Sequence, residues 1–175
     1  IRLIAVSKTF GVDAVRAAMA AGQRDFGENR VQDALPKIEA LPDADVRWHL
    51  IGHLQSNKAR KVVRPFDAIH SIDSLDLLRK VDAAALDSHR QPSLLVQVDL
   101  AGESTKFGAA PDEARAIVAA AATLKAARLV VAAATDDTPK AFKKALAAAL
   151  GQIKGLGARR VEPGAAGQAG HADPL

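Results

Sequence analysis

The chain has 175 residues, 49% of them hydrophobic, which is enough for one globular domain with its own core. It contains no cysteine, which excludes disulfides, zinc–thiolate sites and a cysteine nucleophile. A formal charge of +4 favours anionic ligands, and an aromatic content of 3% argues against a base-stacking platform for nucleic acid.

Apolar runs with strand character alternate with helical segments along the chain. The predicted strands begin near residues 3, 25, 46, 68, 93 and 128. The predicted helices cover residues 13–21, 31–41, 75–86, 114–124 and 141–153. Gly22 is expected to terminate the first helix, and Ser74 is expected to cap the start of the third. This alternation predicts a parallel sheet with right-handed crossovers.

Two α/β folds share this alternation, an open doubly wound sheet and a (β/α)₈ barrel of the TIM type. A doubly wound sheet usually carries a glycine-rich phosphate turn after its first strand, but residues 7–11 read SKTFG. A polar cluster follows nearly every predicted strand, which favours the barrel because its strand ends converge on one mouth. A full barrel takes about 250 residues, so we expect the barrel to be incomplete in this sequence.

Lys8 follows the first predicted strand, whose apolar residues indicate burial on both faces. A lysine at the carboxyl end of such a strand lies where α/β folds place their chemistry. A desolvated amine there is a nucleophile that condenses with an aldehyde to a Schiff base. The alternative is a lysine whose stem lies along the strand end with its charged head in water.

Other polar residues admit two interpretations each. Glu28 and Asp99 are either a general acid/base pair or residues of caps and salt bridges. His49 and His53 are four residues apart, but the segment reads as a strand, so we expect no metal and a hydrogen-bonded inner His49. The basic run 57–64 is either a nucleic-acid patch or, as we favour, a solvated helix face.

Five segments, in this order, resemble the pyridoxal phosphate homeostasis protein family, a small relative of the alanine racemase N-terminal barrel. They are AVSKT (5–9), FGENRVQ (26–32), WHLIGHLQSNK (48–58), HSID (70–73) and ESTKFG (103–108). The resemblance implies a single barrel domain over residues 1–175 that binds pyridoxal 5′-phosphate (PLP). From about residue 130 the chain matches the family poorly.

The resemblance also implies a set of site residues. PLP would be held as a Schiff base on Lys8, and Asn29 would line the same pocket. His49 and Ser71 match inward polar positions, and Lys106 matches a lysine on a loop of the family's site. The family's C-terminal phosphate cradle has no counterpart in this sequence, so we assign no phosphate-binding residue.

The family implies a carrier or regulator of intracellular PLP, with PLP-dependent apoenzymes as partners and neither nucleic acid nor membrane. We expect a cytoplasmic protein, and a monomer rather than a dimer because the second domain of the related racemases is missing. The chain contains no tyrosine, the second base of racemases on this barrel, so we expect PLP binding without robust catalysis. One alternative is a weak PLP enzyme, racemase-like or transaminase-like, that uses Lys8 alone. Another is a basic RNA-binding module without cofactor. Because the chain begins at Ile1 within a strand, we also expect an N-terminal segment to be missing from it.

Overall fold

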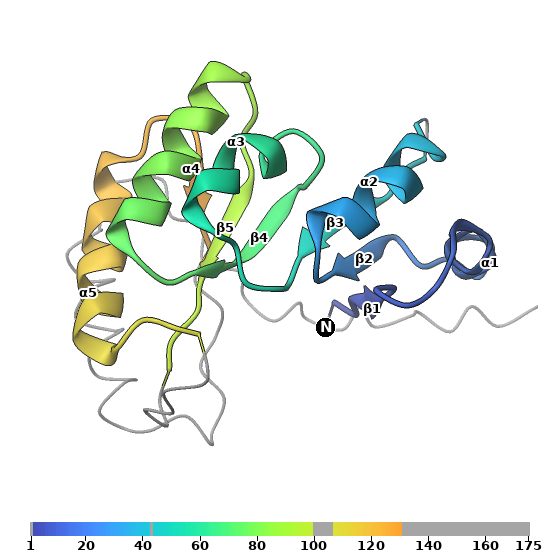
Figure 1. Cartoon of the computed structure of the whole chain (residues 1–175), viewed down its shortest axis with the longest axis horizontal. Coiled ribbons are helices and arrows are strands. Elements are labelled where there is room, and N and C mark those ends of the chain that lie inside the picture. Colours follow the sequence, from blue (N-terminus) through green and yellow to red (C-terminus); the bar gives the residue numbers. More distant parts are fainter. Residues whose placement is uncertain (1, 43, 100–106, 131–175) are drawn as a thin grey trace, which may run out of the picture.

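The computed structural model describes residues 2–42, 44–99 and 107–130, and in that part six strands form one parallel sheet (Figure 1). The strands are β1 (Ala5–Val6), β2 (Asp25–Glu28), β3 (Arg47–Leu50), β4 (Ala68–Ile72), β5 (Ser93–Val96) and β6 (Arg128–Leu129). The helices are α1 (Val12–Ala20), α2 (Val31–Glu39), α3 (Ala59–Val62), α4 (Leu75–Asp87) and α5 (Pro111–Ala120), with 3₁₀ turns η1 (Ser56–Lys58) and η2 (Ala121–Thr123). The predicted alternation of strands and helices is confirmed.

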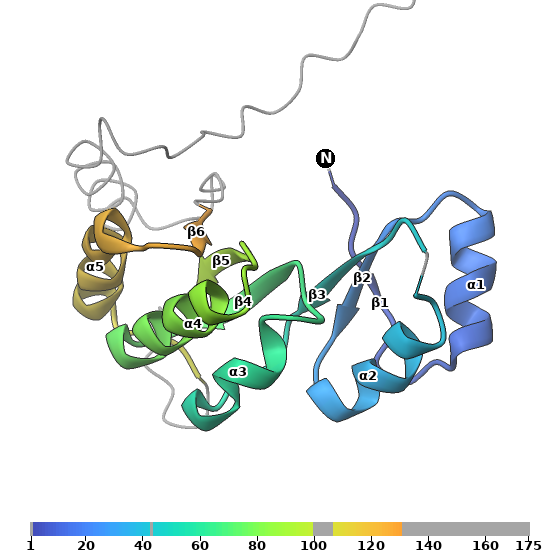
Figure 2. The ribbon, with the colours of Figure 1, turned by 90° about the horizontal axis from the view of Figure 1, so that it is seen from above.

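The order of the strands decides between the two α/β folds. Neighbours in the sheet are also neighbours in the sequence, from β1 to β6, without the reversal that defines a doubly wound sheet. Figure 2 shows the helices of the described part along one face of the sheet. This is the arrangement of a (β/α)₈ barrel wall, of which the described residues contain six strands.

The hydrophobic core lies between the helices and the sheet face that they cover. The rings of Phe26 (β2) and Trp48 (β3) lie 5.7 Å apart, and both residues are buried with Val15 of α1 and Ala34 of α2. Burying one large apolar side chain stabilises the fold by about 1.5–3 kcal/mol. Phe26, Trp48 and Leu50 of the two strands therefore fix which face of the sheet receives the helices.

The helix ends follow the capping residues in the sequence. Gly22 adopts a φ of +95° just after α1, and Ser74 Oγ accepts the Leu77 N–H at 3.3 Å, as predicted. Helix α5 begins at Pro111, earlier than residue 114, because proline fits the first turn and the Glu113 carboxylate accepts the Ala110 N–H. The predicted helix over 141–153 lies outside the described residues.

The first strand differs from its prediction. Leu3 is 72% and Val6 48% exposed, so burial of this strand on both faces was wrong. The physical reason is that, among the described residues, β1 pairs only with β2 and no helix covers the face on which Val6 lies. The strand is also only two residues long, so little of its backbone is held by the sheet.

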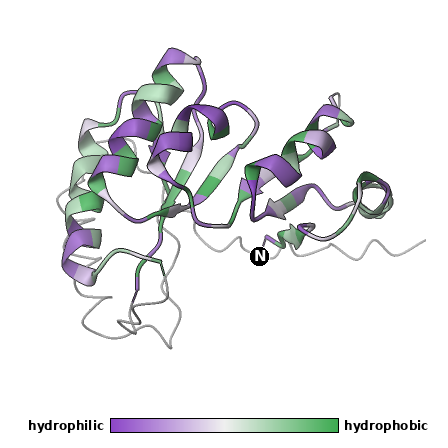
Figure 3. Cartoon of the chain, in the orientation of Figure 1, coloured by the Kyte–Doolittle hydropathy of each residue, from purple (hydrophilic) through white to green (hydrophobic). Residues whose placement is uncertain are grey.

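The basic run 57–64 covers most of η1 and all of α3, and α3 carries both hydrophilic and hydrophobic residues (Figure 3). Ala59 and Val62 are buried, while Arg60 and Lys61 are exposed. Arg60 lies 3.3 Å from the Asp87 carboxylate. The exposed side chains agree with the expected solvated helix face, which stays a prediction. Across the described ranges, no helix combines the length and the apolar character needed to cross a membrane.

Candidate functional site

Lys8 lies in a tight turn directly after β1. The Phe10 N–H donates to the Ser7 carbonyl at 3.0 Å, which leaves Lys8 and Thr9 at the two central positions. The Lys8 side chain is exposed and, within the described part, makes no hydrogen bond or ion pair. The expected desolvation of this amine is therefore wrong for the described part, and no group of that part occupies the amine.

Asn29 follows β2 on the same edge of the sheet. The Ser7 N–H donates to the Gly27 carbonyl at 3.0 Å, which aligns the ends of β1 and β2. The Asn29 side chain is exposed, and its backbone carbonyl lies so close to Gly52 that any Cβ at position 52 would collide with it. Glycine at 52 thus lets the chain after β3 pass against the Asn29 backbone.

His49 lies in a chain of hydrogen bonds on the sheet face away from the helices. Its Nε2 lies 2.9 Å from Asp25 Oδ1, and its Nδ1 lies 2.9 Å from His70 Nε2. Because an ionised carboxylate only accepts, His49 Nε2 must donate to Asp25. The Arg47 guanidinium donates two hydrogen bonds of 2.7 Å to the same carboxylate. The predicted hydrogen-bonded, buried His49 is confirmed.

The titration of this chain follows from its surroundings. The hydrogen bonds from Arg47 lower the pKa of Asp25 to about 2, and the hydrogen bond from His49 adds to this lowering. Burial of the carboxylate acts in the opposite direction. Burial, with the nearby charge of His49, lowers the pKa of His70 to about 4. Near neutral pH, Asp25 is therefore charged and His70 is neutral.

Ser71 supplies an unused polar atom. The residue is fully buried, and its Oγ has no hydrogen-bond partner among the residues that the structure describes. It lies in β4 where the pairing with β5 shifts register, between Ile69 and Ile72. A buried hydroxyl without a partner is costly, and a bound polar ligand would supply the missing hydrogen bond. The residue is therefore compatible with a cofactor pocket.

The salt-bridge interpretation of Glu28 is confirmed, with a partner, Lys37, that had not been predicted. Lys37 Nζ of α2 lies 2.6 Å from Glu28 Oε1 and 2.7 Å from the Ser7 carbonyl oxygen. Glu28 therefore binds Ser7 and Lys37 on the helix-covered face. A signal for Lys37 was present in the sequence, because Val31, Ala34 and Lys37 follow one helical stripe and all three are buried.

The remaining candidates lie elsewhere. His53 stacks on Phe107 with ring centroids 3.6 Å apart and faces Asp73 at 3.4 Å, so it does not share partners with His49. Lys106 lies outside the described residues. Within residues 2–42, 44–99 and 107–130, no three histidine, aspartate or glutamate side chains form a group that could hold a metal.

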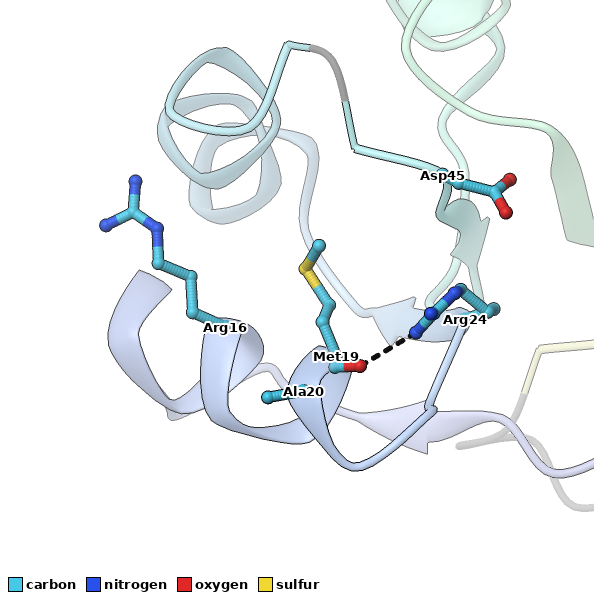
Figure 4. A pocket seen from close by; sticks show the side chains of 5 residues that line it. All are labelled: Arg16, Met19, Ala20, Arg24 and Asp45. Carbon is cyan, nitrogen blue, oxygen red and sulfur yellow. Dashed lines mark hydrogen bonds between the residues drawn. The ribbon is translucent and has the colours of Figure 1, made fainter.

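A surface hollow of about 320 Å³ lies at the opposite end of the strands (Figure 4). It is lined by Arg16 and Met19 of α1, by Arg24, and by Asp45 just before β3. One donor of Arg24 is already used by the Met19 carbonyl, at 2.8 Å. Since Arg24 precedes β2 whereas Lys8 follows β1, this hollow is not part of the Lys8 edge.

The chain is similar in sequence and in fold to known proteins. A family model described as "Alanine racemase, N-terminal domain" matches residues 1–167. The chain belongs to this family. The α/β barrel-type fold expected from the sequence is therefore confirmed, although the strands beyond β6 are outside the described residues.

Several relatives in the family carry the name that the sequence segments indicated. The chain is 50% identical over 109 residues to the pyridoxal phosphate homeostasis protein of Synechocystis sp., covering 62% of this chain and 50% of that protein. It is 38% identical over 154 residues to the protein of that name from Pseudomonas aeruginosa, covering 88% and 66%. The predicted resemblance is confirmed, and the chain spans about half to two thirds of these relatives' lengths.

Solved structures of similar sequence share the fold of this chain. PipY of Synechococcus elongatus, solved without PLP, is 40% identical and superimposes with a TM-score of 0.74, covering 89% of this chain and 76% of PipY. The same protein solved with PLP bound gives 39% identity, a TM-score of 0.72 and the same coverage.

Proposed function

We propose that this chain binds PLP through Lys8 and acts in PLP homeostasis as a carrier or regulator. The observation that carries the proposal is the exposed Lys8 amine at the carboxyl edge of the sheet, which has no partner among the described residues. That edge is where this class of fold builds its sites. The PLP-bound structure of PipY, a relative of 39% identity, supports the choice of cofactor.

The residues of this edge fit the chemistry of an aldehyde cofactor. Lys8 would hold PLP, whose aldehyde carbon would supply the site for a reversible imine with the Lys8 amine, with loss of one water. We propose that Asn29, His49 and Ser71 line the same pocket. The unpartnered Oγ of Ser71 supports this role, because a ligand would satisfy it. The proposed domain is the whole chain, 1–175.

We propose binding rather than turnover as the main activity. Proton transfer on both faces of an amino-acid adduct needs two acid/base groups, and the chain offers neither the tyrosine nor the cysteine that related enzymes use. An exposed lysine favours exchange of PLP with other amines over its retention. The further proposal is that the chain acts as a monomer in the cytoplasm and hands PLP to apoenzymes.

The test is borohydride reduction after addition of PLP, followed by peptide mass mapping. We expect an imine absorption band and a phosphopyridoxyl mass on the peptide that contains Lys8. Lys8→Ala should abolish both and leave the unfolding midpoint unchanged, because the side chain is exposed and unpaired. Lys80→Ala is the matched control, since Lys80 is an exposed lysine whose amine contacts the side chains of Asp76 and Ser56.

Three results would contradict the proposal. A folded parent chain that gives no band would show that Lys8 does not hold PLP. Steady conversion of an amino acid by the parent, lost in Lys8→Ala, would replace the carrier with the weak PLP enzyme. An equal label on many lysines, in both Lys8→Ala and Lys80→Ala, would mean that PLP reacts with exposed amines without a site.

A further inference from the structure

Every polar group of Ser7, the residue before Lys8, is held. Its N–H donates to the Gly27 carbonyl at 3.0 Å, and its Oγ donates to Glu28 Oε1 at 2.6 Å. Its carbonyl oxygen accepts from Phe10 N–H at 3.0 Å and from Lys37 Nζ at 2.7 Å. This peptide oxygen therefore carries two hydrogen bonds, one of them from a charged donor, which is the stronger kind.

The Lys37–Glu28 pair is poorly explained as a source of stability. The side chains are 10% and 0% exposed, and the Nζ to Oε1 distance is 2.6 Å. Removing two charges from water costs about as much as their attraction returns, and an apolar pair of similar volume is often equally stable. In addition, Glu28 Oε2 is buried without a hydrogen-bond partner. A specific geometric role accounts better for such an arrangement.

The geometry supplies that role. The Ser7 carbonyl and the Lys8 amide nitrogen belong to one planar peptide unit, so holding the carbonyl fixes where the Lys8 backbone begins. The strand before this turn is only two residues long and, among the described residues, pairs on one side. The sheet alone therefore holds the turn weakly, and the side chain of Lys37 supplies an anchor from α2.

We infer that Lys37 and Glu28 are positioning residues for Lys8. Together they fix the Ser7–Lys8 peptide and present the Lys8 amine at the carboxyl edge of the sheet. This inference rests on the proposed function. Lys37 itself is not the reacting amine, because its Nζ is buried and bound to two oxygens.

The test uses two variants of the full chain. Lys37→Met removes the anchor but leaves Glu28 buried and unpaired, which endangers folding. Lys37→Met combined with Glu28→Gln removes both charges and keeps an acceptor for Ser7 Oγ. Asp82→Asn is the control, because Asp82 is also a buried carboxylate that binds backbone N–H groups, but on α4, toward the other end of the sheet.

The first measurement needs no cofactor. Amide hydrogen exchange of peptides that span residues 7–10 should be faster by about tenfold or more in the Lys37 variants, because the Phe10 N–H loses a fixed acceptor. Asp82→Asn should leave exchange in this segment unchanged. Parent-like exchange at 7–10 in the folded double variant would overturn the inference.

The second measurement is the rate at which PLP is trapped on Lys8. Misplacement of a reacting group by about 1 Å costs up to about a hundredfold in rate, so we expect trapping to slow by between about tenfold and a hundredfold in the double variant. If the double variant traps PLP on Lys8 at the parental rate, the positioning role is refuted while the proposed function stands. A PLP label on Lys37 in the parent would also refute the positioning role. A parent chain that never traps PLP would instead refute the proposed function.

Discussion

Acidification should destabilise this protein through His70. Burial and the charge of His49 lower the pKa of His70 from 6.5 to about 4. Between these two values the unfolded chain binds a proton that the folded chain does not bind. The free energy of unfolding must therefore fall as the pH drops from 6.5 toward 4, and it is fully recovered above 6.5.

The size of the effect follows from the same two pKa values. Integrated over that interval, the loss from this one residue is at most about 3 kcal/mol. Asp25 acts in a different window, since its pKa of about 2 lies below its ordinary 3.8. Its stabilising contribution is complete above 3.8 and disappears only as the pH falls toward 2, so the two groups are separable.

The assay is urea unfolding of the parent and of His70→Gln from pH 7 down to about 4.5, where Asp25 stays charged. Glutamine keeps an amide group that can form a hydrogen bond with His49 Nδ1 but does not titrate. We expect the free energy of unfolding of His70→Gln to fall less than that of the parent over this pH range. The slope of the free energy of unfolding against urea concentration should be the same in both proteins. His89→Asn is the control, because His89 is exposed and asparagine tolerates its φ of +52°. Superimposable pH curves for parent and His70→Gln would refute the reasoning.

Two further predictions concern backbone anchoring. The Asp82 carboxylate accepts the N–H groups of residues 125–127 at 2.8 to 3.1 Å. Because these N–H groups would lose their acceptor, Asp82→Ala should lower the free energy of unfolding by about 2–4 kcal/mol. A loss below about 0.5 kcal/mol in urea unfolding would contradict this prediction. Gly52→Ala should cost about 1–3 kcal/mol, because the new Cβ meets the Asn29 backbone. The Gly52→Ala substitution should also slow the trapping of PLP on Lys8. An unchanged trapping rate would show that Asn29 does not line the PLP pocket.

The architecture was predictable because hydrophobic period and turn residues act locally. The starts of β2 to β6 and the ends at Gly22 and Ser74 depend on neighbouring residues, and the structure agrees with them. The sequential strand order was also predictable, because short crossovers place successive parallel strands side by side. The exposure of Val6 was not, since burial depends on what covers a strand rather than on its own apolar residues.

The site was predictable only in part for a similar reason. Lys8 and Asn29 could be located from the ends of their strands, and His49 from its place within β3. The partners of His49 could not, because Asp25 and His70 belong to other strands and the contact depends on strand register. Lys37 resembled an ordinary surface lysine, and only its stripe with Val31 and Ala34 indicated otherwise.

Strand β2 shows how one short segment serves two kinds of chemistry. Successive side chains of a strand point to opposite faces, so Phe26 and Glu28 face the helices while Asp25 faces the other side. A carboxylate under helices has no access to water, and it therefore needs the cation that α2 supplies. The Asp25 carboxylate on the other face is also buried, and it binds both Arg47 and His49. The same alternation thus places a fixed charge pair behind Lys8 and a titrating histidine chain on the opposite side of the sheet.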